Sequence, residues 1–222
     1  MEKTIGQAGQ FTTIYDHELQ RIEHYQKHPQ MMPFIGADYG KFGPKILLIA
    51  ESHYLRKGST IHLEAQSWYD CQASQLVDHE RSSTYTRRCL TKDGRTWKIK
   101  AYTIFRNLEA SLIEAGYPRA DNTLRYVAFM NGFQRPAVSR LSIKASSVDL
   151  KYSLPTIRAV LDAIKPDHVV FVSRKAYHAF GDQLDVPVCS APHPASPWWN
   201  RSSKRGTGKD QFVRLMKGLQ LT

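Results

Sequence analysis

The sequence predicts an α/β fold in one domain, a three-layer αβα sandwich built on a four-stranded parallel sheet. The first observation behind this prediction is that apolar runs of strand length alternate with segments of helical spacing. Such alternation is typical of βαβ units, whose parallel sheet is covered by helices on both faces. The second is the length of 222 residues, which suits one domain with its own core. We therefore expect a single domain over 1–222, with 1–30 as an N-terminal helical extension.

The N-terminal quarter supplies the extension, a loop and the first strand. Apolar and aromatic side chains recur at helical spacing in 11–28, which predicts a helix. Glycine and proline dominate 33–44, which predicts a loop. The stretch 45–50 reads Lys-Ile-Leu-Leu-Ile-Ala, and an unbroken apolar run of this kind predicts a strand that is buried on both faces.

The remaining elements follow in the order that βαβ units require. Segment 61–100 mixes helical spacing with polar runs and yields no clear prediction. Segment 151–164 predicts a helix with Pro155 in its first turn, where proline is tolerated. The other predicted helices cover 100–116, 174–180 and 209–219, and the other predicted strands cover 124–130, 168–172 and 186–189.

The charge of the chain favours a polyanionic partner. Lys and Arg number 31 against 20 Asp and Glu, which gives a formal net charge of +11 and a pI near 9.6. A positive field attracts nucleic acid and raises the rate of encounter. We expect DNA to be the partner and the protein to be a monomer, although a basic protein without such a partner has the same composition.

Other functional classes find little support. No apolar run reaches the ~18–20 residues that span a bilayer, and the N-terminus lacks the layout of a signal peptide. Three scattered cysteines, Cys71, Cys89 and Cys189, favour a reducing cytoplasm over a disulfide framework. The C-x-x-C and H-E-x-x-H metal motifs and the P-loop do not occur, so we expect neither a metal nor a cofactor.

Polar side chains follow each predicted strand, at the edge of the sheet where ligands of parallel sheets bind. After the fourth strand, segment 193–200 reads His-Pro-Ala-Ser-Pro-Trp-Trp-Asn. Its prolines restrict the backbone, so one imidazole and two indoles are presented at little entropic cost. The groups that meet at this edge are 51–54 after the first strand, 131–135 after the second, 173–174 after the third and 193–194 after the fourth.

In order and spacing, these segments resemble the uracil-DNA glycosylase superfamily. Members of that superfamily have a first motif after the first strand, an asparagine after a second strand, a helix–strand–helix unit, and an H-P-S-P-type loop before the last helix. This chain has Ala-Glu-Ser-His-Tyr at 50–54, Asn131, a similar unit at 164–176 and His-Pro-Ala-Ser-Pro at 193–197. The resemblance covers about residue 33 to the C-terminus. It implies a glycosylase-like fold. It also implies an enzyme that hydrolyses the N-glycosidic bond of uracil or another modified base in DNA.

The resemblance also implies roles for individual residues. Glu51 would position the attacking water, unless its carboxylate instead pairs with an arginine or caps a backbone group. His193 would donate a hydrogen bond to the base oxygen as negative charge develops there, with a loop histidine bonded to the backbone as the competing interpretation. Asn131 would read the edge of the base, with the turn role of an Asn-Gly pair as the competing interpretation. The residues expected to bind the base are Ser52, Tyr54, Asn131 and Phe133, with a place in the core as the competing interpretation of the two aromatic side chains.

The segment after His193 is expected to contact nucleic acid. Trp198 or Trp199 would fill the gap that an extruded base leaves, and we expect one of the two to pack beneath the loop instead. The expected phosphate contacts are Arg201, Lys204, Arg205 and Lys209.

Departures from the family pattern leave two other functions open. Ser52 stands where one branch has a water-activating aspartate, whereas Glu51 matches the glutamate of another branch. Ala195 is an extra residue in the last loop, and three unclustered cysteines are too few for the iron–sulfur cluster of some members. One alternative is a non-catalytic protein on the same fold that binds nucleic acid or nucleotides. The other is an unrelated small-molecule hydrolase that uses Ser52 and His53 as nucleophile and base.

Overall fold

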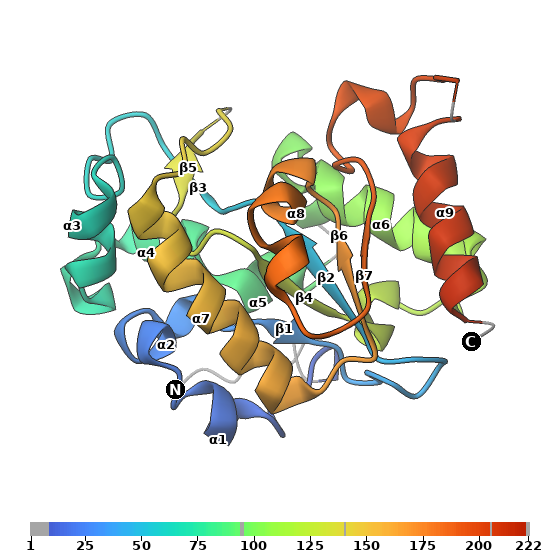
Figure 1. The fold of residues 1–222 in the computed structure, drawn as a ribbon, viewed down its shortest axis with the longest axis horizontal. Coiled ribbons are helices and arrows are strands. Elements are labelled where there is room, and N and C mark those ends of the chain that lie inside the picture. The colour runs from blue at the N-terminus through green and yellow to red at the C-terminus, as the bar shows by residue number, and fades with distance from the viewer. Residues whose placement is uncertain (1–8, 94–95, 140, 205, 221–222) are drawn as a thin grey trace.

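A computed structural model shows an α/β protein with a five-stranded, mostly parallel sheet (Figure 1). It describes residues 9–93, 96–139, 141–204 and 206–220. The strand order is β1-β4-β2-β6-β7, in which β1 alone runs antiparallel to its neighbour. The strands of this sheet are β1 (Phe34–Ile35), β2 (Ile46–Ala50), β4 (Ala128–Asn131), β6 (His168–Phe171) and β7 (Val188–Ser190).

The four parallel strands are the predicted ones, but the prediction of a sheet with only four strands is wrong at one edge. Strand β1 lies inside the segment that we expected to be a loop, and its two residues are too few to show a period of two. Gly36 follows it directly. A Cβ at Gly36 would lie 2.2 Å from the carbonyl oxygen of Arg125, so only glycine allows this close approach of the two backbones.

Helices cover both faces of the sheet, with α7 and α8 on one face and α6 and α9 on the other (Figure 1). The side chains of β2 show why, because they alternate between two cores. Leu47 and Ile49 belong to the core beneath α7 and α8, whereas Ile46, Leu48 and Ala50 belong to the core beneath α6 and α9. The bounds of these helices are α6 (Thr103–Glu114), α7 (Ser147–Ile164), α8 (Arg174–Phe180) and α9 (Gly208–Leu219).

Capping residues determine where the long helices begin. Ser146 and Asp149 form a capping box at the start of α7, so this helix begins four residues earlier than its apolar spacing predicts. Pro155 therefore lies inside α7 and not in its first turn. It lacks the N–H that would bond to the carbonyl of Lys151, a residue that lies on the exposed side of the helix.

The N-terminal extension is less helical than its spacing predicts. The helix expected over 11–28 is replaced by two short helices, α1 (Asp16–Leu19) and α2 (Glu23–Lys27), and by a bridge between Phe11 and Gly36. Ile14 is 76% exposed, so the apolar spacing on which the prediction rested does not form one buried stripe. The part of the extension at 1–8 lies outside the described residues.

Segment 61–100, which the sequence left unassigned, consists of short helices beside the strand ends. They are α3 (Ala65–Asp70), α4 (Asp78–Ser83) and α5 (Thr86–Leu90), followed by the 3-10 turns η3 (Thr96–Lys98) and η4 (Lys100–Tyr102). A small parallel sheet of β3 (Tyr54–Leu55) and β5 (Ala137–Val138) extends the chain beyond β2 and β4. The start of the predicted strand at 124–130 is instead the turn η5 (Thr123–Tyr126), because the Asn122 side chain accepts a hydrogen bond from the Leu124 N–H.

Candidate functional site

A pocket of about 340 Å³ opens at the carboxyl ends of β2 and β4. Its volume lies within the range of about 300–1,000 Å³ that is usual for small-ligand sites. Four of the predicted site residues, Ser52, Tyr54, Asn131 and His193, line it together. They come from three segments that are distant in the sequence, so the parallel sheet is what brings them to one place.

Asn131 is the last residue of β4 and not a turn residue. It pairs with Ala50 in the parallel ladder, and the pairing continues as the Gly132 N–H donates to the Ala50 carbonyl over 2.9 Å. The side chain of Asn131 is 7% exposed and lines the pocket. Its amide makes no hydrogen bond to any described residue, so both its donor and its acceptor are available to a ligand.

His193 is held as a neutral hydrogen-bond donor. The backbone N–H of Ala195 donates to Nδ1 of His193 over 3.1 Å, which makes Nδ1 the acceptor and leaves the ring proton on Nε2. Burial lowers the pKa of His193, and the charge of Glu51 only partly opposes this effect. The loop itself is anchored from α6, where the Asn107 side chain donates to the Pro194 carbonyl over 2.6 Å.

The two residues after Glu51 are buried in the wall of the pocket. Ser52 is 7% exposed, and its hydroxyl has no partner among the described residues. His53 Nε2 lies 2.9 Å from the Thr86 hydroxyl, whose single proton goes to the Met31 carbonyl, so Nε2 must be the donor. Burial lowers the pKa of His53 to about 4. This imidazole is bonded to Thr86 and not to Ser52, which gives no support to a Ser52–His53 nucleophile and base.

Glu51 does not line the pocket, and its carboxylate already accepts hydrogen bonds from neighbouring segments. One oxygen accepts from the Ser142 hydroxyl over 2.6 Å and from the Ile143 N–H over 3.0 Å, and the other accepts from the Ser173 hydroxyl over 3.4 Å. Glu51 thus ties segment 142–143 to the ends of β2 and β6. It still lies within electrostatic range of His193 and Tyr54, because its charge raises the pKa of both.

Aromatic side chains form the walls, but Phe133 is not one of them. Phe133 is fully buried and packs against Phe180, with 5.0 Å between the ring centroids, so its assignment to base binding is wrong. The period of two in β4 ends at Gly132, and a residue beyond that point no longer faces the same way as Asn131. Phe129, two residues before Asn131, lines the pocket and could have been found from this spacing.

The remaining walls come from segments for which the sequence made no site prediction. Ser82, Ser83 and Cys89 of α4 and α5 contribute on one side, and Tyr102 and Phe105 at the start of α6 contribute on another. Burial raises the pKa of the Cys89 thiol to about 11, so this side chain is a neutral, weakly polar part of the wall.

The two tryptophans after His193 have opposite surroundings. Trp198 is 60% exposed, whereas Trp199 is 1% exposed and packs against Phe212 with 5.7 Å between the ring centroids. Trp199 is thus the tryptophan of the pair that packs into the core, as we expected of one of the two, and its indole is not exposed to bind nucleic acid. Of the two tryptophans, only Trp198 presents an exposed aromatic face.

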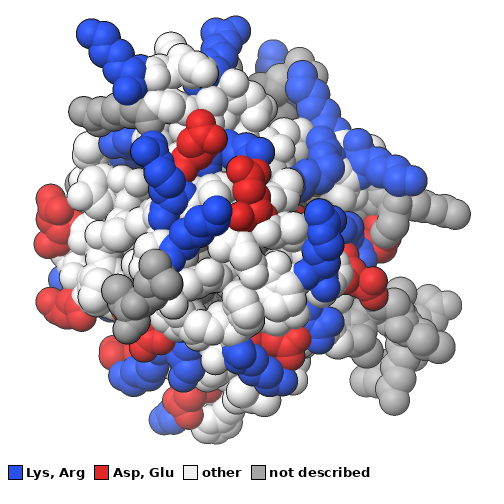
Figure 2. All heavy atoms as spheres, turned by 90° about the vertical axis from the view of Figure 1, so that its right-hand side faces the viewer, with Lys and Arg blue, Asp and Glu red and all other residues white. Residues whose placement is uncertain are grey.

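The basic segment after the tryptophans is partly free and partly paired. Arg201 and Lys204 are exposed, whereas Lys209 forms an ion pair with Glu114 at 2.6 Å, and Arg205 lies outside the described residues. Figure 2 shows the side of the molecule that carries α9, with Lys and Arg along its upper edge and, over the rest of this face, interspersed with acidic side chains. The charge available to a polyanion is thus smaller than four adjacent cations would provide.

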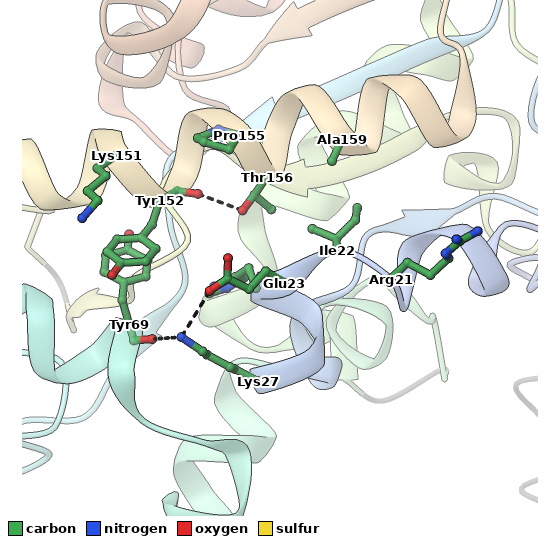
Figure 3. A pocket seen from close by; sticks show the side chains of 11 residues that line it. Arg21, Ile22, Glu23, Lys27, Tyr69, Lys151, Tyr152, Pro155, Thr156 and Ala159 are labelled. Atoms are coloured by element: carbon green, nitrogen blue, oxygen red, sulfur yellow. Dashed lines mark hydrogen bonds and ion pairs between the residues drawn. The ribbon is translucent and has the colours of Figure 1, made fainter.

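A second cavity, of about 420 Å³, lies between α2 and α7 (Figure 3). The ammonium group of Lys27 is already bonded there, to the Tyr69 carbonyl at 3.2 Å and to Glu23 at 3.5 Å. The charged ends of Arg21 and Lys151 point to opposite sides of Figure 3. Because these polar groups do not converge, the pocket at the strand ends is the stronger candidate.

Metal ligands and membrane-spanning helices were sought over the described ranges. No group of three or more His, Cys, Asp or Glu side chains there is arranged to hold a metal ion. No helix in the same ranges is long and apolar enough to cross a bilayer. Comparison of the sequence with known protein families and with curated proteins gave no match.

Proposed function

We propose that this protein takes a nucleobase of DNA into the pocket at the strand ends and hydrolyses its N-glycosidic bond. The observation that carries the proposal is the fixed tautomer of His193, because the Ala195 N–H on Nδ1 leaves an Nε2–H donor in a pocket that also holds the free amide of Asn131. The three-layer, glycosylase-like fold that the sequence resembles is part of this proposal. The parallel sheet with helices on both faces is consistent with it.

The proposed reaction requires only a few groups from the protein. Water adds to the sugar carbon as the bond from that carbon to the base nitrogen breaks, and the electron pair leaves with the base. The added water releases a proton to solvent, and the departed base takes up a proton from solvent. Negative charge then develops on the base oxygen, where a preorganised donor stabilises the transition state more than the ground state. His193 supplies that donor, Asn131 holds the base edge, and the aromatic walls contact its faces. Extrusion of the base costs a few kcal/mol, which Trp198 offsets by stacking in the vacated space.

The contacts of Glu51 favour a second candidate, a protein that binds a base without cleaving it. A residue that activates water needs a free acceptor, and one Glu51 oxygen already accepts two hydrogen bonds from segment 142–143. In this second function, the pocket recognises a base or nucleotide and releases it intact.

Base release from defined oligonucleotides separates the two functions. The substrates are single- and double-stranded DNA that carry uracil or hypoxanthine, and the readouts are free base and alkali-sensitive abasic sites. We expect His193→Ala to slow base release by about 100- to 1,000-fold, as is typical for loss of one transition-state donor. We expect Glu51→Ala to slow it by about 100-fold or more if Glu51 positions water.

The outcomes test the residue roles and distinguish the two functions. Rates that are unchanged in both variants would exclude the proposed roles of Glu51 and His193. Tight binding of these oligonucleotides by the unaltered protein with no free base would select the non-catalytic function. The variant Arg158→Ala is the control, since Arg158 contacts the Gln183 carbonyl and does not line the pocket.

A further inference from the structure

Arg88 of α5 contacts a residue that lines the pocket, although it is not itself one of the lining residues. Its guanidinium donates to the Ser82 hydroxyl over 2.7 Å, and Ser82 lines the pocket. Its charge also acts on two further lining residues, because it opposes the burial that raises the pKa of Cys89 and of Tyr102. One hydrogen bond and two electrostatic interactions with lining residues therefore place this cation beside the pocket.

The charge of Arg88 is not neutralised within the described chain. Arg88 is exposed and forms no ion pair with any described Asp or Glu. Its neighbours in the sequence and in space differ in this respect. Arg87 is buried and bonded to Asp16, and Arg81 of α4 is paired with Asp78.

A guanidinium with a free side suits a particular ligand group. Its planar fork matches two oxygens of a phosphate or carboxylate, and the bond to Ser82 reduces the number of rotamers that binding must freeze. The pocket beside it has aromatic walls and a free amide, which suit a heterocyclic base. A heterocyclic base and an adjacent anionic oxygen group are two parts of a nucleotide.

We propose that Arg88 binds the phosphate of the nucleotide whose base occupies the pocket, with Ser82 holding the guanidinium in place. The identity of the occupant as a base rests on the proposed function, whereas the anion site does not require hydrolysis. The phosphate belongs either to a mononucleotide or to a nucleic-acid strand, and the two sources share this chemistry.

Calorimetric titration of the whole protein tests the site. The ligands are deoxyuridine and deoxyinosine, their bisphosphates, and short single-stranded oligonucleotides that contain uracil or hypoxanthine. We expect Arg88→Ala to weaken binding of the bisphosphates by about 10- to 100-fold, the usual effect of losing a charge-assisted hydrogen bond, and to leave nucleoside binding unchanged. Arg88→Lys keeps the charge but not the fork, so we expect it to restore only part of the loss.

Arg81→Ala is the matched control, because it removes the same charge from the neighbouring helix while the pocket keeps all its lining residues. We expect Arg81→Ala to bind every ligand as the unaltered protein does.

If the phosphate belongs to a nucleic-acid strand, Arg88→Ala should also reduce the slope of log affinity against log salt by about 0.7 on single-stranded DNA. A loss with bisphosphates but not with oligonucleotides would identify mononucleotides as the ligand.

Three results would overturn this inference: unchanged bisphosphate and oligonucleotide binding by Arg88→Ala, an equal loss for nucleosides and nucleotides, or no binding of any nucleotide by the unaltered protein. Melting temperatures of the variants show whether each is folded. Arg88-dependent binding without base release would sustain the phosphate site while the proposed hydrolysis fails. Base release that does not depend on Arg88 would sustain the proposed hydrolysis while the phosphate site fails.

Discussion

Two histidines of the pocket show how single hydrogen bonds assign a tautomer. At His193 a backbone N–H donates to Nδ1, and at His53 the ring itself donates from Nε2 to Thr86. Both rings therefore carry their proton on Nε2, but only at His193 is this proton free for a ligand. Burial lowers the pKa of both side chains, so both are neutral near pH 7.

We expect base release to depend on pH through His193. Protonation would add a proton to Nδ1, opposite the Ala195 N–H that now donates to it, and would displace the ring. The rate should therefore be constant from neutral to alkaline pH and should fall on acidification, with a midpoint below the ordinary histidine pKa of about 6.5. Ring nitrogen shifts in NMR spectra, assigned with His193→Gln, measure both the tautomer and the midpoint.

Two NMR results would contradict this prediction for His193. A His193 ring that carries its proton on Nδ1 at pH 8, or that titrates above pH 6.5, would remove the fixed donor on which the proposed chemistry depends.

At the scale of elements, the turn η7 (Pro197–Trp199) divides two adjacent indoles between core and surface. We expect Trp199→Ala to destabilise the protein by about 3–5 kcal/mol, as for other large core side chains. We expect Trp198→Ala to change stability by less than about 0.5 kcal/mol and to weaken DNA binding, since an exposed indole stacks on a base. Urea unfolding and DNA titration of the pair measure the two effects.

The prediction fails if the two variants behave alike. Equal destabilisation would mean that both indoles are core residues, and equal DNA binding by Trp198→Ala and the unaltered protein would show that Trp198 does not contact the strand.

The elements that the sequence predicted are those in which one local signal dominates. The apolar run of β2, for example, predicts a buried strand without tertiary information. The α/β class is confirmed for this reason. Strand β1 was missed because its formation depends on the contact between Gly36 and Arg125, which no local pattern encodes.

The same limit applies to the site. Residues that follow strands, such as Asn131 and His193, were placed at one edge by the rule for parallel sheets. Segment 61–100 was not, since its short helices depend on distant partners, such as the pair of Arg87 with Asp16. Phe133 was misassigned because the chain turns at Gly132, whereas Glu51 was predicted as catalytic without knowledge of segment 142–143, whose groups bond to it.

At the scale of the whole molecule, the net charge of +11 is a weaker argument than its distribution. Many cations are paired internally, as Lys209 is with Glu114 and Arg135 with the buried Asp149. The exposed, unpaired Arg88 lies beside the pocket. At least this positive charge is therefore available to an anion beside the candidate site, where electrostatic steering is useful.

Acid stability is a second property of the whole molecule, and it depends on buried histidines. Burial lowers the pKa of His28 and of His53 to about 4, and it lowers the pKa of His24 well below the usual range. Between about pH 6.5 and pH 4 the unfolded chain binds protons at these sites while the folded chain does not. The free energy of unfolding should therefore fall as the pH drops through this window.

The expected loss of unfolding free energy is large, and it occurs in a pH range separate from that of the carboxylates. A pKa difference of about 2.5 at His28 or His53 corresponds to roughly 3 kcal/mol each at pH 4, against a typical total stability of about 5–15 kcal/mol. Carboxylates with lowered pKa values, such as Asp149, lose their contribution only below about pH 4, so the two effects separate. Urea unfolding from pH 7 to pH 4.5 measures the slope. His53→Gln, which does not titrate and keeps a donor for Thr86, should reduce that slope, and equal stability at pH 7 and pH 5 would contradict the burial of these rings.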